Sequence, residues 1–157
     1  MPAFTSMRPH SEAGFTMTEI LVVILIIGVL SAIAVPTLLT QRQKGIDVAA
    51  KTNVATASRA MVIYEQDHDT YQCGTAAQCV DALRSIEPAL PGSGLDVSDS
   101  GGTGDATKRA YRVTGAGGDR RTFWVDRDPS GTQRGCDLNG SQDNGGCRVS
   151  GGSGGQW

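Results

Sequence analysis

The first third of the chain is dominated by one long apolar run. From Ile20 to Val35, sixteen residues carry no charge and only one hydroxyl group, that of Ser31. Extended to Leu39, the run has twenty residues, which is about 30 Å of helix and matches the hydrocarbon core of a bilayer. Because the rest of the chain holds too little apolar material to surround such a helix, residues 15–39 are predicted to span a membrane.

Beyond Pro36 the apolar residues become periodic, and the polarity of the chain rises. They recur in steps of three and four residues, which places them on one face of an α-helix; they are Ile46, Ala50, Val54, Ala57, Met61 and Tyr64. We therefore expect one long helix from Phe15 to Asp67. Its first half is predicted to be membrane-spanning, and its second half, residues 40–67, to be amphipathic.

The remainder of the chain predicts short elements joined by loops. A helix is expected over 79–87, followed by a loop rich in Pro, Gly, Ser and Asp. Apolar and polar residues alternate over 110–114 and 122–126, and the Gly-rich connection between these segments is typical of a β-hairpin. A third strand is expected over 132–136, after a turn at 128–131 that has proline at its favoured position.

Together these elements predict an α+β fold, in which the long helix packs on a small antiparallel β-sheet domain spanning 40–157. Of the 21 glycines, 17 lie in residues 92–157, and the tail 150–155 is expected to be flexible. The formal net charge of the 157 residues is −2, so the molecule as a whole offers no basic surface.

Four cysteines lie on the C-terminal side of the apolar run: Cys73, Cys79, Cys136 and Cys147. None has the C-x-x-C spacing of zinc or thioredoxin-like sites. An even number of cysteines in a small, Gly-rich region favours disulfides and an oxidising compartment. Of the three possible pairings, the short sequence separations favour Cys73–Cys79 and Cys136–Cys147.

The residues that precede the apolar run are polar. Residues 1–14 include Arg8, Glu12 and two prolines, and we interpret them as a leader. No A-x-A-like site closes the apolar run, which argues against an ordinary secretory signal peptide. Glu19 lies next to the apolar run. Its carboxylate could simply lie at the bilayer edge, near a helix N-terminus whose dipole favours it, or it could have a function. The residues alone leave both interpretations open.

A known family signature covers about 23 contiguous residues of this region. Gly14-Phe15-Thr16-Met17-Thr18-Glu19, followed by the apolar run to Pro36, closely resembles the N-terminal signature of type IV prepilins. The resemblance implies a pilin fold and cleavage after Gly14 by a dedicated peptidase on the cytoplasmic face. It also implies N-methylation of Phe15, a role for Glu19 in docking into a filament, and a helix kink at Pro36.

The resemblance further implies the partners and the location of the protein. A filament of identical or similar pilins is expected, together with the prepilin peptidase and methyltransferase, the pilus assembly machinery and, before assembly, membrane lipid. The C-terminus would lie outside the cytoplasmic membrane, and the assembled filament would be extracellular. The Gly-rich end, with its terminal Trp157, is loosely similar to some Gram-positive type IV pilins.

Two other functions stay open at this point. One is a pseudopilin of a type II secretion system, which would share the N-terminal machinery. The other is a binding module held at the membrane by an uncleaved anchor, which would keep residues 1–14. Cleavage of residues 1–14 distinguishes the two filament proteins, pilin and pseudopilin, from this anchored module.

Little in the chain points to catalysis or to a cofactor. After processing the only histidine is His68, and no phosphate-binding loop occurs; we expect no enzyme, no catalytic residue and no cofactor. Asp126, Asp128, Ser130 and Asp137 partly match a calcium loop, but a β-turn explains the same residues, and no metal is expected.

Nucleic acid is a further candidate partner. Eight basic residues follow position 107: Lys108, Arg109, Arg112, Arg120, Arg121, Arg127, Arg134 and Arg148. Eight acidic residues between Asp96 and Asp143 balance them. The favoured interpretation is therefore a solvated surface on which basic and acidic side chains are mixed. DNA capture would require the hairpin to place the basic residues on one face and the acidic residues on the other.

Overall fold

The computed structural model describes residues 14–98, 109–141, 145–149 and 154–157. The chain divides into two compact units, residues 1–39 and 40–157. The helix α1, Met17–His68, is 52 residues long and supplies the described helical part of the first unit and the beginning of the second. It begins two residues after the predicted start and ends one residue beyond the predicted end.

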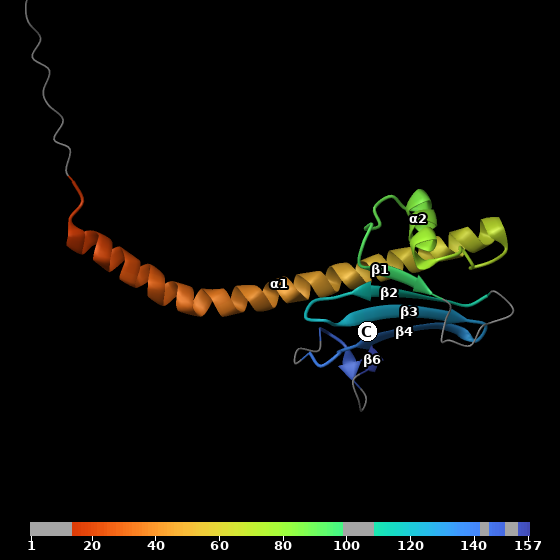
Figure 1. Ribbon diagram of the computed structural model, residues 1–157. Helices are drawn as coiled ribbons and strands as arrows, with labels where there is room; N and C mark the ends of the chain where they lie inside the picture. The colour runs from red at the N-terminus through yellow and green to blue at the C-terminus, as the bar shows by residue number, and fades with distance from the viewer. Residues whose placement is uncertain (1–13, 99–108, 142–144, 150–153) are drawn as a thin grey trace, which may run out of the picture. The chain divides into compact units, whose positions relative to one another are not determined.

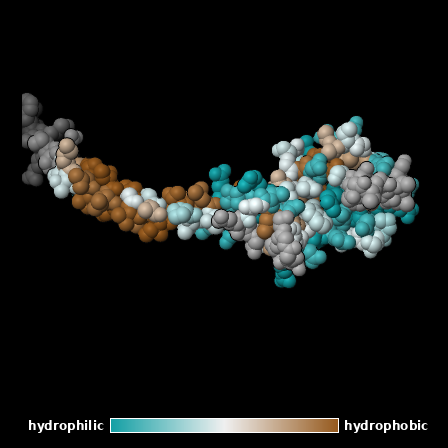
Figure 2. Space-filling model, turned by 60° about the horizontal axis from the view of Figure 1, so that its bottom comes forward, coloured by the Kyte–Doolittle hydropathy of each residue, from teal (hydrophilic) through white to brown (hydrophobic). Residues whose placement is uncertain are grey.

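In the first unit, the side chains of α1 are exposed. Every residue from Ile20 to Leu39 is exposed, and Figure 2 shows hydrophobic side chains covering this part of the helix. Within the described residues, α1 is the one helix long and apolar enough to cross a membrane, and none of its most apolar window is buried. A soluble core helix would be enclosed by other elements, so this exposure fits membrane anchoring.

In the second unit, six strands form one antiparallel sheet (Figure 1). They are β1 (Leu95–Ser98), β2 (Tyr111–Ala116), β3 (Thr122–Asp128), β4 (Gly131–Asp137), β5 (Arg148–Val149) and β6 (Gly154–Gln156). Their order in the sheet is β1-β2-β3-β4-β6-β5. The three predicted strands are confirmed as β2, β3 and β4, joined as two successive hairpins.

The second part of α1 and the helix α2, Ala76–Ile86, pack on one face of the sheet (Figure 1). The core they enclose contains Val54, Ala57 and Met61 of α1, Val80 and Leu83 of α2, and Val97, Tyr111, Val113 and Val125 of the sheet. The strand residues alternate between buried and partly exposed positions, as expected of a sheet covered on one face. The predicted α+β class is confirmed.

The helix α2 starts three residues before the predicted position because of its cap. Thr75 Oγ1 accepts a hydrogen bond from the Gln78 N–H at 3.4 Å, and Gln78 Oε1 accepts one from the Thr75 N–H at 2.8 Å. This reciprocal pair is a capping box, which satisfies two backbone N–H groups that a helix start leaves unpaired. The helix ends at Ile86, two residues before Pro88.

Two predictions about loops are wrong. Part of the loop expected after the second helix is β1, whose Leu95 and Val97 oppose Gly115 and Val113 of β2. Of the tail 150–155 expected to be flexible, Gly154 and Gly155 belong to the strand β6 (Gly154–Gln156), which pairs with both β4 and β5; residues 150–153 lie outside the described residues. A glycine-rich strand such as β6 is held by backbone hydrogen bonds, so it leaves no side-chain pattern in the sequence.

The buried face of α1 is shifted from the predicted one at its start. Val54, Ala57 and Met61 are buried as expected, but Ile46 is 39% exposed. Its neighbour Asp47 is buried instead, with 2% exposure. A charged side chain therefore occupies the first core-facing position of α1 in this unit, which requires a partner inside the fold.

Both disulfides join cysteines that are close in sequence. Cys73 of the loop between the two helices is bonded to Cys79 of α2. Cys136 of β4 is bonded to Cys147, which directly precedes β5. This is the pairing that the short separations favour, and each bridge closes a segment with few core residues of its own.

Candidate functional site: the N-terminal segment and a polar clasp

The segment that resembles a prepilin processing site lies at the start of α1, with Gly14 and Phe15 just before the helix. Gly14, Phe15 and Met17 are exposed, with Phe15 at 80% and Met17 at 92%. Nothing lies within 4 Å of the position that a Cβ on Gly14 would take. The peptide bond between Gly14 and Phe15 therefore lies in an open part of the chain, directly before the first turn of the helix.

Glu19 belongs to a second capping box, which the sequence analysis did not recognise. Thr16 Oγ1 accepts a hydrogen bond from the Glu19 N–H at 3.1 Å, and Glu19 Oε2 accepts one from the Thr16 N–H at 3.5 Å. Thr16-Met17-Thr18-Glu19 has the T-x-x-E pattern of such a box, so the signal was present in the sequence. The carboxylate also lies at the positive end of the helix dipole.

Pro36 lies inside α1, which is helical on both sides of it. Proline cannot donate the backbone hydrogen bond of a helix interior. One residue on, Thr37 Oγ1 donates to the carbonyl oxygen of Ala34 at 2.8 Å. The kink at Pro36 stays a prediction.

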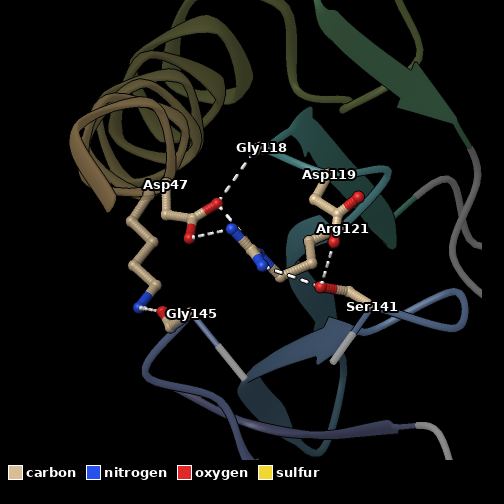
Figure 3. A network of polar contacts seen from close by, with 7 residues as sticks. Asp47, Gly118, Asp119, Arg121, Ser141 and Gly145 are labelled. Atoms are coloured by element: carbon tan, nitrogen blue, oxygen red, sulfur yellow. Dashed lines mark hydrogen bonds and ion pairs between the residues drawn. The ribbon is translucent and has the colours of Figure 1, made fainter. Parts of the chain in front are cut away.

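In the second unit, a buried ion pair holds α1 against the sheet (Figure 3). Asp47 Oδ2 lies 2.7 Å from Arg121 Nη2, and the two side chains are 2% and 1% exposed. Asp47 Oδ1 also accepts hydrogen bonds from the Gly118 N–H at 2.8 Å and from Arg121 Nε at 3.2 Å. The two charges are thus paired with each other, and the carboxylate also accepts a hydrogen bond from a backbone N–H. Buried charges are tolerated in proteins when they are paired and hydrogen-bonded in this way.

The same group extends to the loop between Cys136 and Cys147. Arg121 Nη1 donates to Ser141 Oγ at 2.8 Å, and Ser141 Oγ donates to Asp119 Oδ2 at 2.7 Å. Lys51 Nζ of α1 donates to the carbonyl oxygen of Gly145 at 2.7 Å. We call Asp47, Gly118, Arg121, Ser141 and Gly145 the polar clasp, since they join a helix, a hairpin turn and a disulfide-closed loop (Figure 3).

The clasp corrects one part of the sequence analysis. Arg121 is one of the eight basic residues for which solvated, mixed charges are the favoured interpretation, but it is buried. Arg112 is also paired, with Asp126 Oδ2 at 2.8 Å, and its guanidinium lies 4.5 Å from the centre of the Trp124 ring. Two of the eight basic residues are therefore neutralised by specific partners, and Lys108 lies outside the described residues.

Asp128 and the residues that follow it form a turn between β3 and β4. Asp128 Oδ1 accepts hydrogen bonds from the N–H groups of Ser130 and Gly131 at 2.8 and 3.0 Å, and from the Ser130 hydroxyl. The Ser130 hydrogen bonds hold the pKa of the Asp128 carboxyl below its ordinary value. The turn interpretation is confirmed, because the segment joins β3 to β4.

No other group of side chains in the described ranges suggests chemistry. Among these residues, three or more His, Cys, Asp or Glu side chains nowhere gather in a way that would hold a metal ion. His68 is the exposed last residue of α1 and stacks on Tyr64, with ring centres 4.0 Å apart. It is therefore a helix-end residue.

Comparison with known proteins supports the resemblance seen in the sequence. Residues 9–35 match the family described as the prokaryotic N-terminal methylation motif. The type II secretion system core protein G of Aeromonas hydrophila is 32% identical over 85 residues, which are 54% of this chain and 58% of that protein. The core protein G of Klebsiella michiganensis is 33% identical over the same shares of the two chains.

A pilus protein is similar to the same extent. The type IV wide pilus major component PilA4 of Thermus thermophilus is 33% identical over 76 residues, which are 48% of this chain and 58% of that protein. The chain thus spans rather more than half the length of these curated relatives, and none of their names describes an enzyme. No solved structure matches the chain. From the motif, the fold and the relatives, we conclude that the chain is a pilin-like protein carrying the N-terminal methylation motif of the type IV pilin class.

Proposed function

We propose that this protein is a structural subunit of a type IV pilus, processed by a prepilin peptidase and polymerised into a helical surface filament. The observation that carries the proposal is the exposed Gly14–Phe15 junction directly ahead of a helix whose apolar side chains from Ile20 to Leu39 are all exposed. Such a surface requires lipid or other protein around it. Its proposed surroundings are membrane lipid before assembly and the helices of other subunits afterwards.

Processing removes the leader 1–14 on the cytoplasmic face and leaves Phe15 as the first residue, which is then N-methylated. The membrane and assembly segment is 15–39, and the domain 40–157 lies outside the cytoplasmic membrane. The two disulfides support this placement, because disulfides persist in oxidising compartments. The role is structural and requires no catalytic residue in this chain.

Glu19 acquires its function when subunits assemble. In the single chain its carboxylate is exposed and accepts one long hydrogen bond, at 3.5 Å, from the Thr16 N–H. Inside a filament the carboxylate leaves water, and losing one partner of a buried charge pair typically costs about 3–5 kcal/mol. The amine that cleavage creates on Phe15 of a neighbouring subunit is the partner, and this pairing sets the axial register.

The capping box makes it possible to separate the two roles of Glu19. Glu19→Gln keeps a side chain that completes a capping box but removes the charge, whereas Thr16→Ala removes the cap and keeps the charge. We expect Glu19→Gln and Glu19→Ala to be inserted and cleaved normally but to yield few filaments. We expect Thr16→Ala to assemble.

Processed subunit and sheared filament are to be measured separately for each variant, together with the intact mass of the filament protein. A mature chain beginning at Phe15 with a methylated amine is expected. Filament protein that retains residues 1–14 would overturn the processing step and favour the anchored binding module. Normal filament yield from Glu19→Gln would mean that the carboxylate acts only as a helix cap.

The second candidate is a pseudopilin of a type II secretion system. The similarity to core protein G over 54% of this chain favours it. In that case, deleting the chain would block protein secretion, and filaments sheared from the cell surface would lack it. Glu19 and Phe15 would have the same roles in both candidates.

A further inference from the structure

The sheet ends on one side at β1, and the outer edge of this strand is free (Figure 1). Among the described residues, β2 is the one strand that pairs with it. The Ala116 N–H donates to the Gly94 carbonyl oxygen at 2.9 Å, so these two residues form a hydrogen-bonded pair. Such pairs alternate along an antiparallel ladder. The backbone N–H and C=O groups of Leu95 and Val97 therefore point away from β2, where another extended chain can pair with them.

A large cavity lies beside the middle and the end of β1. It has a volume of about 710 Å³ and is lined on the strand by residues 96–98. Its other walls contain Tyr71 and Tyr111 and the two cysteines of the Cys73–Cys79 disulfide. Aromatic rings and sulfur atoms both pack favourably against a further aromatic ring. The cavity therefore suits an aromatic side chain.

A smaller cavity, of about 290 Å³, lies beside the start of β1, where Leu95 lines it. Three apolar residues of α2 form part of its opposite wall: Ala76, Ala77 and Val80. This wall suits a short aliphatic side chain. Leu95 and Val97 are two residues apart, which is about 7 Å along a strand. Because residues two apart in a strand point to the same face, one incoming strand can place two of its side chains in the two cavities.

The charge beside this edge is negative. Residues 76–98 carry three carboxylates and one guanidinium, and the exposed Asp81 lines the smaller cavity. Asp96 is also exposed, and within the described residues it forms no ion pair. It lies between Leu95 and Val97 and on the opposite face of β1 from both. The middle residue of an incoming strand would therefore lie opposite Asp96, where lysine or arginine gives a favourable cross-strand pair.

We propose that the free edge of β1 is a docking site for an extended, basic segment of a partner protein, which adds to the sheet as an antiparallel strand. The segment places an aromatic residue in the large cavity, lysine or arginine opposite Asp96, and a short aliphatic residue in the smaller cavity. Main-chain hydrogen bonds supply affinity in this mode of binding, and the side-chain pockets supply specificity. The antiparallel direction continues that of the other strands and puts the aromatic residue first. The site lies in the second unit alone and does not depend on whether the chain forms filaments.

The probe is the fluorescently labelled peptide Thr-Tyr-Lys-Val-Thr with blocked ends, titrated against the full chain in detergent micelles. Its matched control is the reversed peptide, Thr-Val-Lys-Tyr-Thr, which has the same composition and charge. The reversed peptide fills both cavities only as a parallel strand, which pairs less favourably with the edge. We expect the probe to bind about tenfold more tightly than the control.

N-methylation of single peptide bonds tests the backbone pairing. In the antiparallel arrangement, the tyrosine and valine N–H groups of the probe donate to the carbonyl oxygens of Val97 and Leu95. The lysine N–H points away from β1. Methylation of the tyrosine or the valine nitrogen should weaken binding about tenfold, because a backbone acceptor loses its donor. Methylation of the lysine nitrogen should change the affinity little.

The site on the protein is tested by charge exchange. Asp96→Lys should weaken binding of the probe and favour a peptide in which glutamate replaces lysine. Asp67→Lys makes the same charge change at an exposed position near the end of α1, and it should leave both affinities unchanged. Amide hydrogen exchange of the unaltered chain gives a readout that needs no variant to fold. Exchange at Leu95 and Val97 should slow when the probe binds, whereas exchange at Asp96, which pairs with β2, should not.

Equal affinity of the probe and the reversed peptide overturns the proposal, and so does the absence of measurable binding by the probe. Unchanged exchange at Leu95 and Val97 in the presence of bound probe also overturns it, because the peptide would then lie elsewhere. Tighter binding of the reversed peptide, lost on methylation of its lysine nitrogen, contradicts the antiparallel arrangement. Slow exchange at Leu95 and Val97 that depends on protein concentration, without any peptide, would assign the edge to a second copy of the chain instead.

Discussion

Gly115 of β2 lies directly beneath α1, and adding one methyl group there tests how the helix packs on the sheet. In Gly115→Ala, the new Cβ would lie 2.5 Å from Val54 Cγ2 and 3.2 Å from the carbonyl oxygen of Ala50. Unstrained carbon–carbon contacts are about 3.5–4.0 Å. The methyl group is therefore roughly 1 Å or more too close to Val54, a side chain with 0% exposure.

The neighbours of Gly115 have little freedom to move. Valine in a helix strongly prefers one side-chain rotamer, and the Ala50 oxygen belongs to the helix backbone. Overpacking of this kind typically costs about 1–3 kcal/mol, and we expect Gly115→Ala to lie near the upper end of that range. The matched control is Gly45→Ala in α1, where nothing lies within 4 Å of the new Cβ; it should stabilise the chain by about 0.5–1 kcal/mol.

The assay is urea unfolding in detergent micelles, followed by the fluorescence of Trp124 and Trp157, both of which lie in the second unit. Val54→Ala removes the methyl group that clashes, so the double variant with Gly115→Ala should be less destabilised than the sum of the two single variants. An unfolding midpoint for Gly115→Ala equal to that of the unaltered chain would refute the packing described. Strict additivity in the double variant would refute it as well.

Two further predictions concern the core of the same unit. The Leu83 side chain in α2 is 1% exposed, so Leu83→Ala should destabilise the chain by about 2–5 kcal/mol. Asp81→Ala, on the exposed side of α2, should change the free energy of unfolding by less than about 0.5 kcal/mol. Urea unfolding of both variants measures these changes. Burial raises the pKa of Tyr111, partly offset by its hydrogen bond to Ser58. The buried neutral phenol therefore contributes stability that is present below the ordinary tyrosine pKa of about 10 and is lost as pH rises through the raised value. A pH titration should show one phenolate appearing together with unfolding, and its persistence in Tyr111→Phe would contradict the assignment.

Much of the proposed assembly segment is visible in the sequence because it is local. The junction of Gly14 and Phe15, the carboxylate of Glu19 and the proline at position 36 lie within a contiguous stretch, and the apolar run between them needs no tertiary contact to be recognised. The capping box of Thr16 and Glu19 is equally local, since the two residues lie three positions apart. The hairpin strands β2, β3 and β4 follow the same rule, since their alternation and their turns lie in adjacent residues.

The sequence by itself thus determined the long apolar helix, the amphipathic continuation, the α+β class and the pairing of nearby cysteines. Only the tertiary structure decided that Asp47 rather than Ile46 faces the core, because its partner Arg121 lies 74 residues away. It also decided that Leu95–Ser98 and Gly154–Gln156 are strands, since their backbone hydrogen bonds depend on which strand lies alongside and not on their own side chains. A contact between residues close in sequence leaves a pattern that can be read, whereas the burial of a charge or the pairing of a glycine strand depends on the partner that folding brings to it.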